Sequence, residues 1–195
     1  MLRTNNIVIG LIFALFSAQF LLVLMLGAAI APAYSIHDNA ISDLGVIPQT
    51  ALLFNTSLFL FGLFMIIAAY FYHHEHNKLW ITILFIISGV GAIGVALFPE
   101  NNPGIHAIFA FIAFVFANII PIGISTILPK PLNILSIATG ILGLIFLIIF
   151  MISDINILNL DSLIGYGGSE RMIVYPVLLW LVAFGSYCMA SSLKK

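Results

Sequence analysis

Long apolar stretches separated by short polar breaks run through the whole chain. A transmembrane helix needs about 20 mostly apolar residues to cross about 30 Å of hydrocarbon, because each residue adds about 1.5 Å. Six stretches meet this requirement, and they cover approximately residues 6–28, 51–72, 79–98, 104–128, 132–152 and 172–192. The pattern therefore predicts an all-α, polytopic membrane bundle of six transmembrane helices.

Turn-forming residues interrupt the apolar stretches where the chain has to reverse direction. Proline, glycine, asparagine and serine favour turns over regular helix. The breaks fall at residues 31–35, 73–78, 99–104 and 129–131 and in the Gly/Ser-rich segment before Glu170, and each contains at least one of these residues. No polar block between the spans is long enough to fold separately, so residues 1–195 are predicted to form a single integral membrane domain.

The composition excludes a soluble globular protein. The chain is 63% hydrophobic and only 7% charged, and its mean hydropathy is +1.22. A soluble domain with so few charges could not solvate its surface. No basic patch indicates nucleic-acid binding, and the single cysteine, Cys188, rules out an intrachain disulfide.

The few charged residues are divided between the two ends of the predicted bundle. The basic residues on the side of the termini are Arg3, Lys78, Lys130, Lys194 and Lys195. The acidic residues on the opposite side are Asp38, Asp43, Glu100, Asp154, Asp161 and Glu170. Because basic residues concentrate in cytoplasmic loops, we expect a multi-pass protein of the cell membrane with both termini in the cytoplasm.

The first apolar stretch allows a second interpretation, as a cleaved signal peptide. Ala31-Pro32-Ala33 resembles a small-x-small cleavage site, but the stretch before it is longer than the roughly 7–15 apolar residues of a signal peptide. Cleavage would leave five spans and place the termini on opposite faces. We therefore keep this stretch as a helix, although the sequence leaves cleavage open.

Polar residues gather in four segments at the acidic end of the bundle. The ends of six bundled helices lie within a few helix diameters, so these segments are expected to meet. Carboxylates and histidine can transfer protons, and the candidate catalytic residues are Asp43, Glu100, His106 and Glu170. The candidate ligand-binding residues are Arg171, Tyr34, Ser42 and Asp154, with Arg171 proposed to hold an anionic head group.

Arg171 follows Glu170 at the predicted start of the last span, where a positive charge opposes the helix dipole. Ser169 is placed to cap this helix. We expect Arg171 to form a bidentate pair with a carboxylate, which would tie the last span to another segment. The available partners are Asp43, Glu100, Asp154 and Glu170. A second interpretation is that these groups only form a satisfied polar cap on the helix ends.

Metal binding is not indicated by the sequence. One histidine among carboxylates is a poor zinc signature, since zinc sites usually have more His or Cys ligands. His73-His74-Glu75-His76 lies in a predicted turn at the other end without a second ligand cluster, which favours a solvated loop. The sequence therefore predicts no metal site, and any cofactor is unknown.

Three short segments carry a family resemblance. They are Ala40-Ile41-Ser42-Asp43-Leu44-Gly45, the stretch from Phe98-Pro99 to His106, and Gly168-Ser169-Glu170-Arg171. Together they resemble DUF998, a prokaryotic family of six-span membrane proteins of unknown function, over essentially the whole chain. More distantly, the segment after the first span is similar to the eukaryotic Frag1/DRAM/Sfk1 group, some of whose members are linked to lipid remodelling or autophagy. Neither resemblance implies established catalytic residues.

Three classes of function remain. The first is a non-catalytic lipid-binding or accessory protein with a polar site on the outer face, whose partners are membrane lipids, a second copy or another membrane subunit. The second is a membrane enzyme acting on a lipid or lipid-linked substrate, which requires His106 within about 10 Å of a carboxylate. The third is a small-molecule transporter or channel with kinks at Pro121 and Pro176, although the spans lack midplane charges and inverted repeats.

Overall fold

Six long helices make up the computed structural model, which describes residues 4–154 and 163–193. The helices are α1 (Thr4–Ile30), α2 (Ala51–His76), α3 (Leu79–Leu97), α4 (Pro103–Ile124), α5 (Leu132–Asp154) and α6 (Gly165–Leu193). Two short 3-10 helices, η1 (Ser42–Gly45) and η2 (Ser125–Ile127), lie in the connections. The six long helices are each long and apolar enough to cross a membrane, which confirms the predicted all-α bundle.

α2 and α6 extend into segments that the sequence pattern marks as breaks. α2 continues through His76, so the histidine segment is its last turn and not a separate loop. It ends at Asn77, whose φ of 50° is the left-handed conformation common after a helix C-terminus. α6 begins at Gly165, and Ser169 therefore lies in its second turn instead of capping it.

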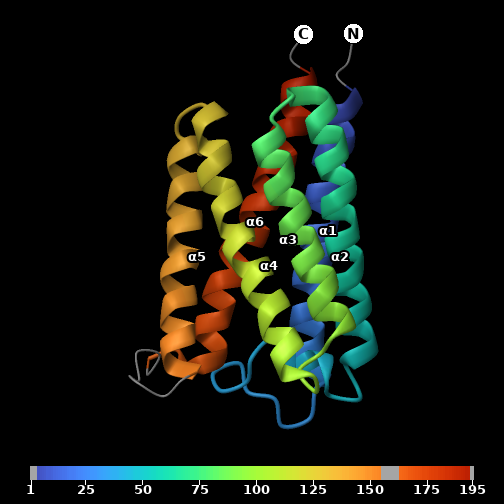
Figure 1. The fold of residues 1–195 in the computed structure, drawn as a ribbon, viewed down its shortest axis with the longest axis vertical. Helices are drawn as coiled ribbons and strands as arrows, with labels where there is room; N and C mark the ends of the chain where they lie inside the picture. The colour runs from blue at the N-terminus through green and yellow to red at the C-terminus, as the bar shows by residue number, and fades with distance from the viewer. Residues whose placement is uncertain (1–3, 155–162, 194–195) are drawn as a thin grey trace.

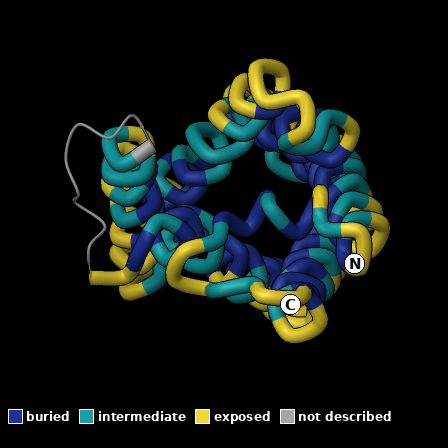
Figure 2. Tube along the Cα trace, turned by 90° about the horizontal axis from the view of Figure 1, so that it is seen from below, coloured by how far each residue is buried: buried dark blue, intermediate teal, exposed yellow. Residues whose placement is uncertain are grey.

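The helices are arranged in a ring that follows the order of the chain (Figures 1 and 2). Each helix packs against the next, and α6 closes the ring by packing along α1. Figure 2 shows the buried positions on the inner sides of the helices and the exposed positions on their outer sides. One cluster of buried side chains, including Phe13, Phe85 and Trp180, fills the half near the termini. A second cluster, including Phe20 and Phe54, fills the other half.

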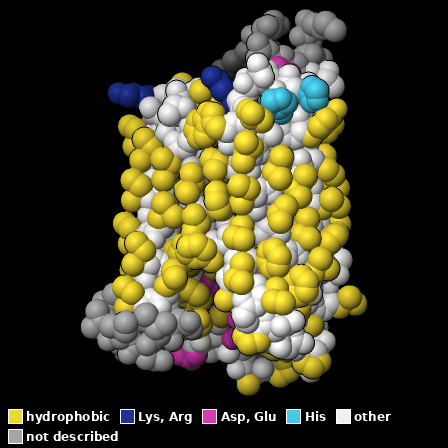
Figure 3. Space-filling model, in the orientation of Figure 1, with side chains coloured by type: hydrophobic (Ala, Val, Ile, Leu, Met, Phe, Trp, Pro, Cys, Tyr) yellow, Lys and Arg dark blue, Asp and Glu magenta, His cyan; other side chains and the backbone are white. Residues whose placement is uncertain are grey.

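The two ends of the bundle carry different charges. In Figure 1 both termini and the α2–α3 and α4–α5 connections lie at the upper end, which we call the terminal end. The α1–α2 and α3–α4 connections and the start of α6 lie at the lower end, which we call the loop end. Figure 3 shows an apolar band between basic and histidine side chains above and acidic side chains below. This separation is the one that the sequence predicts.

Candidate functional site

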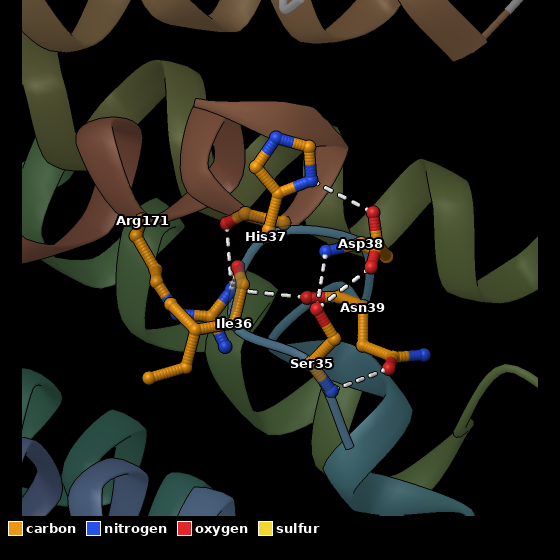
Figure 4. Close-up of polar contacts among 7 residues, drawn as sticks. Ser35, Ile36, His37, Asp38, Asn39 and Arg171 are labelled. Carbon is orange, nitrogen blue, oxygen red and sulfur yellow. Dashed lines mark hydrogen bonds and ion pairs between the residues drawn. The ribbon is translucent and has the colours of Figure 1, made fainter. Parts of the chain in front are cut away.

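Arg171 holds the connection between α1 and α2 against the start of α6 (Figure 4). Its Nη1 donates to the carbonyl oxygens of Ile36 at 3.1 Å, Asn39 at 3.0 Å and Gly167 at 2.6 Å. Its Nη2 donates to the hydroxyl of Tyr34 at 2.6 Å. Arg171 is only 6% exposed, so these contacts replace the water that its guanidinium loses on burial.

Tyr34 extends this network along the connection. Its hydroxyl donates to the carbonyl oxygen of Ala40 at 2.7 Å, and its ring centroid lies 5.6 Å from the guanidinium carbon of Arg171. That separation is within the range of a cation–π interaction. Burial raises the pKa of Tyr34 to about 12, although the nearby charge of Arg171 acts in the opposite direction. The hydroxyl therefore keeps its proton and continues to donate it to Ala40.

Glu170 binds the same connection through a different backbone group. Its carboxylate oxygen Oε2 accepts a hydrogen bond from the backbone amide of Ile41, and the residue is only 3% exposed. Glu170 and Arg171 are adjacent on α6, and one receives an amide hydrogen while the other donates to carbonyl oxygens. Together they fix residues 36–41 to the last helix.

Two glycines allow the connection to approach the backbone of α6. Gly165 has a φ of 74°, and a Cβ placed on it would collide with the carbonyl oxygen of His37. A Cβ on Gly167 would collide with the carbonyl oxygen of Asn39, while its amide donates to the carbonyl oxygen of His37 at 2.9 Å. These contacts explain why a segment that the sequence marks as a break is the first turn of a helix.

The connection also forms hydrogen bonds of its own, several of which are drawn in Figure 4. Asp38 accepts from the hydroxyl of Ser35 at 2.7 Å and lies 2.7 Å from Nδ1 of His37. The hydrogen bond to His37 is the main reason that the pKa of Asp38 is lowered, and Ser35 adds to it. Asn39 donates from Nδ2 to Asp43 at 2.9 Å. The exposed side of the connection is thus ordered by local contacts.

The contacts of Arg171 differ from the expected carboxylate pair. Within residues 4–154 and 163–193, its acceptors are three carbonyl oxygens and one hydroxyl. The side chain of Asp154, one of the expected partners, and the whole of Asp161 lie outside the described residues. Arg171 ties the last helix to another segment, as the sequence predicts, but through backbone groups. Its assignment to an anionic head group stays a prediction.

Ser42, Glu100 and His106 meet beside Glu170 and form with it what we call the polar cluster. The hydroxyl of Ser42 donates to Oε1 of Glu100 at 2.5 Å, and Nε2 of His106 lies 4.0 Å from the same oxygen. Nδ1 of His106 is 2.9 Å from the carbonyl oxygen of Phe98. Because a carbonyl oxygen only accepts, Nδ1 carries a hydrogen and Nε2 is the nitrogen on the side of Glu100.

An inner cavity extends from the polar cluster into the centre of the bundle, between α1, α2, α3, α4 and α6. Its walls are mostly apolar, and Ser42, His106 and Glu170 line its end. The lining of α6 runs from Glu170 to Leu181, about 16 Å at 1.5 Å per residue, which is about half of the hydrocarbon thickness. Its volume is about 80 Å³, so the cavity is narrow over this depth.

A side cavity of about 380 Å³ lies between α4, α5 and α6 at the loop end. All four residues of the polar cluster line it, and Ser42, His106 and Glu170 are shared with the inner cavity. Figure 3 shows a hollow in the lower half of the apolar face with acidic side chains at its base. The two cavities therefore adjoin at these shared residues, one reaching the centre of the bundle and the other its membrane-facing side.

The structure brings together only some of the residues predicted from the sequence. Glu100, His106, Glu170 and Ser42 share the side cavity, whereas Asp43 is bonded to Asn39 and lines neither cavity. The aromatic walls, which no sequence pattern indicates, consist of Phe111, Phe114, Phe150 and Tyr166. Among the described residues, no group of three His, Cys, Asp or Glu side chains is placed to hold a metal ion.

The fold and the site define a class: a multi-pass helical membrane protein with a buried polar cluster at one end of an internal apolar cavity. Residues 4–187 match the family model DUF998, described as a protein of unknown function, and the chain therefore belongs to that family. This match confirms the family resemblance of the three short segments. Neither a curated protein nor a solved structure matches the chain.

Proposed function

We propose that this protein is a non-catalytic binding protein for a lipid or another amphiphile of the membrane. The observation that carries the proposal is the junction of the two cavities at Ser42, His106 and Glu170. In this proposal the narrow inner cavity receives part of a single alkyl chain, and its depth of about 16 Å is close to that of one leaflet. The polar head of the same molecule would then lie in the side cavity against the polar cluster.

Selectivity in such a site comes from the polar cluster. A chain that leaves the bilayer exchanges one apolar environment for another, so the inner cavity gains little from the hydrophobic effect. Ionisable residues at membrane depth are costly and are generally retained for function. Glu170 and His106 are both buried and both line the two cavities, so they are the residues that would bind the polar head.

In this proposal Arg171 and Tyr34 position the site without forming it. They hold residues 36–41, and Ser42 follows directly in the chain. Ser42 in turn donates to Glu100 of the α3–α4 connection. The polar cluster therefore depends on the attachment of the α1–α2 connection to α6.

A membrane enzyme acting on a lipid or lipid-linked substrate is the second candidate. The observation in its favour is that Nε2 of His106 lies 4.0 Å from Glu100, which meets the distance requirement set for acid–base chemistry. Glu170 lines the same cavity and could act as a second acid or base. Asp43 is also predicted as catalytic, but it lines neither cavity, so the candidate enzyme assigns it no role.

We further infer that the loop end faces the outside of the cell membrane and that both termini are cytoplasmic. Lys78 and Lys130 at the terminal end support this orientation. The prokaryotic origin, the distant similarity to the Frag1/DRAM/Sfk1 group, transport activity and a partner or second copy of the chain all stay predictions.

The binding proposal can be tested by native mass spectrometry of protein purified in a mild uncharged detergent. Ala110 lines both cavities and Ala117 the inner one, whereas Ala138 is exposed on α5 and lines neither. Leucine at either of the first two positions should fill the cavity and reduce a retained amphiphile by roughly tenfold. Ala138→Leu, the matched control, should retain it.

Three outcomes separate the candidates. Loss of the adduct in both cavity variants alone supports binding. An adduct that is equally abundant in all variants, or absent from the wild type even after incubation with total membrane lipid, overturns it. A bound molecule that changes mass with time in the wild type but not in Glu100→Gln favours the enzyme instead.

A further inference from the structure

The polar cluster presents hydrogen-bond acceptors to the side cavity, because its own donors are engaged within the protein. The hydroxyl of Ser42 donates to Glu100, and His106 directs Nδ1 to the carbonyl oxygen of Phe98. The amide of Ile41 donates to Glu170. Carboxylate oxygens and the second imidazole nitrogen are acceptors when His106 is neutral, so a ligand of this cluster has to supply the donors.

The charge of the side cavity is also one-sided. Two of its lining residues, Glu100 and Glu170, are acidic, and none of the lining residues within the described part of the chain is Lys or Arg. The nearby base, Arg171, is bonded to the α1–α2 connection and lines neither cavity. Acidic residues in a largely apolar cavity, without a lysine or arginine among its described lining residues, attract a cation and repel an anion more strongly than they would in water.

Aromatic rings line the same cavity as these acceptors. Phe111 and Phe114 come from α4, while Phe150 of α5 stacks on Tyr166 of α6 with ring centroids 4.4 Å apart. The faces of aromatic rings attract ammonium groups within about 6 Å of the centroid, and aromatic cages that bind ammonium ligands use this effect. Acidic residues beside aromatic rings form a surface that suits a cationic head group.

We propose that the side cavity recognises the ammonium head group of a cationic amphiphile whose chain enters the inner cavity. This inference rests on the proposed binding function and names the chemical class of the ligand. An ammonium head can donate hydrogen bonds to Glu100 and Glu170 or, if it is fully alkylated, place its methyl groups against the rings. A sulfate or carboxylate head would bring a negative charge next to the acidic side chains of Glu100 and Glu170.

The test compares amphiphiles that share a dodecyl chain and differ in the head group. A photoreactive dodecyl maltoside probe reports occupancy of the cavities in uncharged micelles, and mass spectrometry of the labelled peptides locates it on α4 and α6. Competitors are dodecylammonium, dodecyltrimethylammonium and dodecyl sulfate. We expect both ammonium compounds to displace the probe at concentrations roughly tenfold or more below that of the sulfate.

Two sets of variants assign this preference to the cavity. Glu100→Gln should reduce the advantage of the ammonium heads by roughly tenfold, whereas Asp38→Asn, which removes an exposed acid at the same end, should leave it unchanged. Tyr166→Leu should weaken the ammonium compounds several-fold and leave the maltoside probe unaffected. If Glu100→Gln does not fold, Tyr166→Leu still tests the preference for ammonium heads.

The outcomes separate failure of the ammonium inference from failure of the proposed binding function. If the probe labels α4 and α6 but the ammonium and sulfate compounds compete equally, the ammonium inference is overturned while the binding function stands. The same follows if the ammonium preference persists undiminished in both Glu100→Gln and Tyr166→Leu. If neither the maltoside probe nor its photoreactive ammonium counterpart labels the cavity-lining helices, the binding function fails as well.

Discussion

Arg171 is a buried cation whose hydrogen bonds go to backbone carbonyl oxygens. A guanidinium can reach several acceptors in a fixed plane, whereas an ammonium is a single point of charge. We expect Arg171→Lys to lower the free energy of unfolding by about 1–3 kcal/mol, because one ammonium cannot serve the carbonyl oxygens of Ile36 and Asn39 and the hydroxyl of Tyr34 together. Thermal unfolding in detergent measures this loss.

Arg171→Met, which keeps an apolar stem but no donor, should be at least as destabilised as the lysine variant. Lys130→Met is the control, since it removes an exposed positive charge from the other end of the bundle. A wild-type melting temperature for Arg171→Met would show that the carbonyl contacts do not stabilise the fold.

Tyr34 makes the attachment of the connection sensitive to alkaline pH. Burial raises the pKa of Tyr34 from 10.0 to about 12. A group whose pKa is raised on folding stabilises the folded state below its ordinary pKa, and this contribution is lost as the pH rises through the folded value. We therefore expect the connection to stay attached up to about pH 10 and to loosen as the pH approaches 12.

Ultraviolet titration of tyrosinate absorbance should show one phenol titrating near pH 12 that is missing in Tyr34→Phe. The protection of residues 36–41 against hydrogen exchange, relative to the intrinsic rate at each pH, should fall over the same interval in the wild type. A spectrum unchanged by Tyr34→Phe throughout that interval would contradict the burial of this hydroxyl.

The first turn of α6 depends on glycine at Gly165 and Gly167, where the α1–α2 connection lies against the helix backbone. Gly167→Ala would place a methyl group against the carbonyl oxygen of Asn39, and overpacking of this kind typically costs about 1–3 kcal/mol. Gly104→Ala, at the start of α4, meets no atom within 4 Å and should be neutral or slightly stabilising, because alanine favours helix over glycine. Comparison of the two melting temperatures tests the contact, and equal values would argue against it.

The elements that could be predicted from the sequence are those defined by a single stretch of residues. The six apolar stretches predict six helices because span length depends only on local hydrophobicity. The start of α6 could not be found in this way, since Gly165 and Gly167 are helical only because the α1–α2 connection packs against them. Every residue has a backbone carbonyl oxygen, so a sequence pattern cannot show which of these oxygens Arg171 contacts. Carboxylates are therefore the only partners for Arg171 that the sequence predicts.

The sequence predicts part of the polar cluster, because several of its residues are unusual at their positions in the chain. Glu100, His106 and Glu170 stand out because ionisable residues at span ends are rare, and the structure places them around one cavity. Asp43 has the same chemistry but faces Asn39, and no sequence pattern separates it from the others. The phenylalanines of the aromatic walls could not be identified from the sequence, because the chain has 17 phenylalanines and most of them serve equally well as apolar packing residues.

At the scale of the whole molecule, the orientation in the membrane decides from which leaflet the proposed site receives its ligand. If the terminal end is cytoplasmic, the polar cluster lies at the outer leaflet and receives its ligand from there. The chain offers a direct test because Cys188 is its only cysteine and is buried, so Cys188→Ser provides an unreactive background. Single cysteines can then replace Asp38 at the loop end and Lys130 at the terminal end, both of which are exposed.

We expect a membrane-impermeant maleimide to label Asp38→Cys in intact cells and Lys130→Cys only after permeabilisation. The physical reason is that basic residues such as Lys78 and Lys130 are retained on the cytoplasmic side during insertion. Labelling of Lys130→Cys alone in intact cells would invert the orientation and move the site to the inner leaflet. The ligand would then have to come from the cytoplasmic side, although the contacts within the cavities would be unchanged.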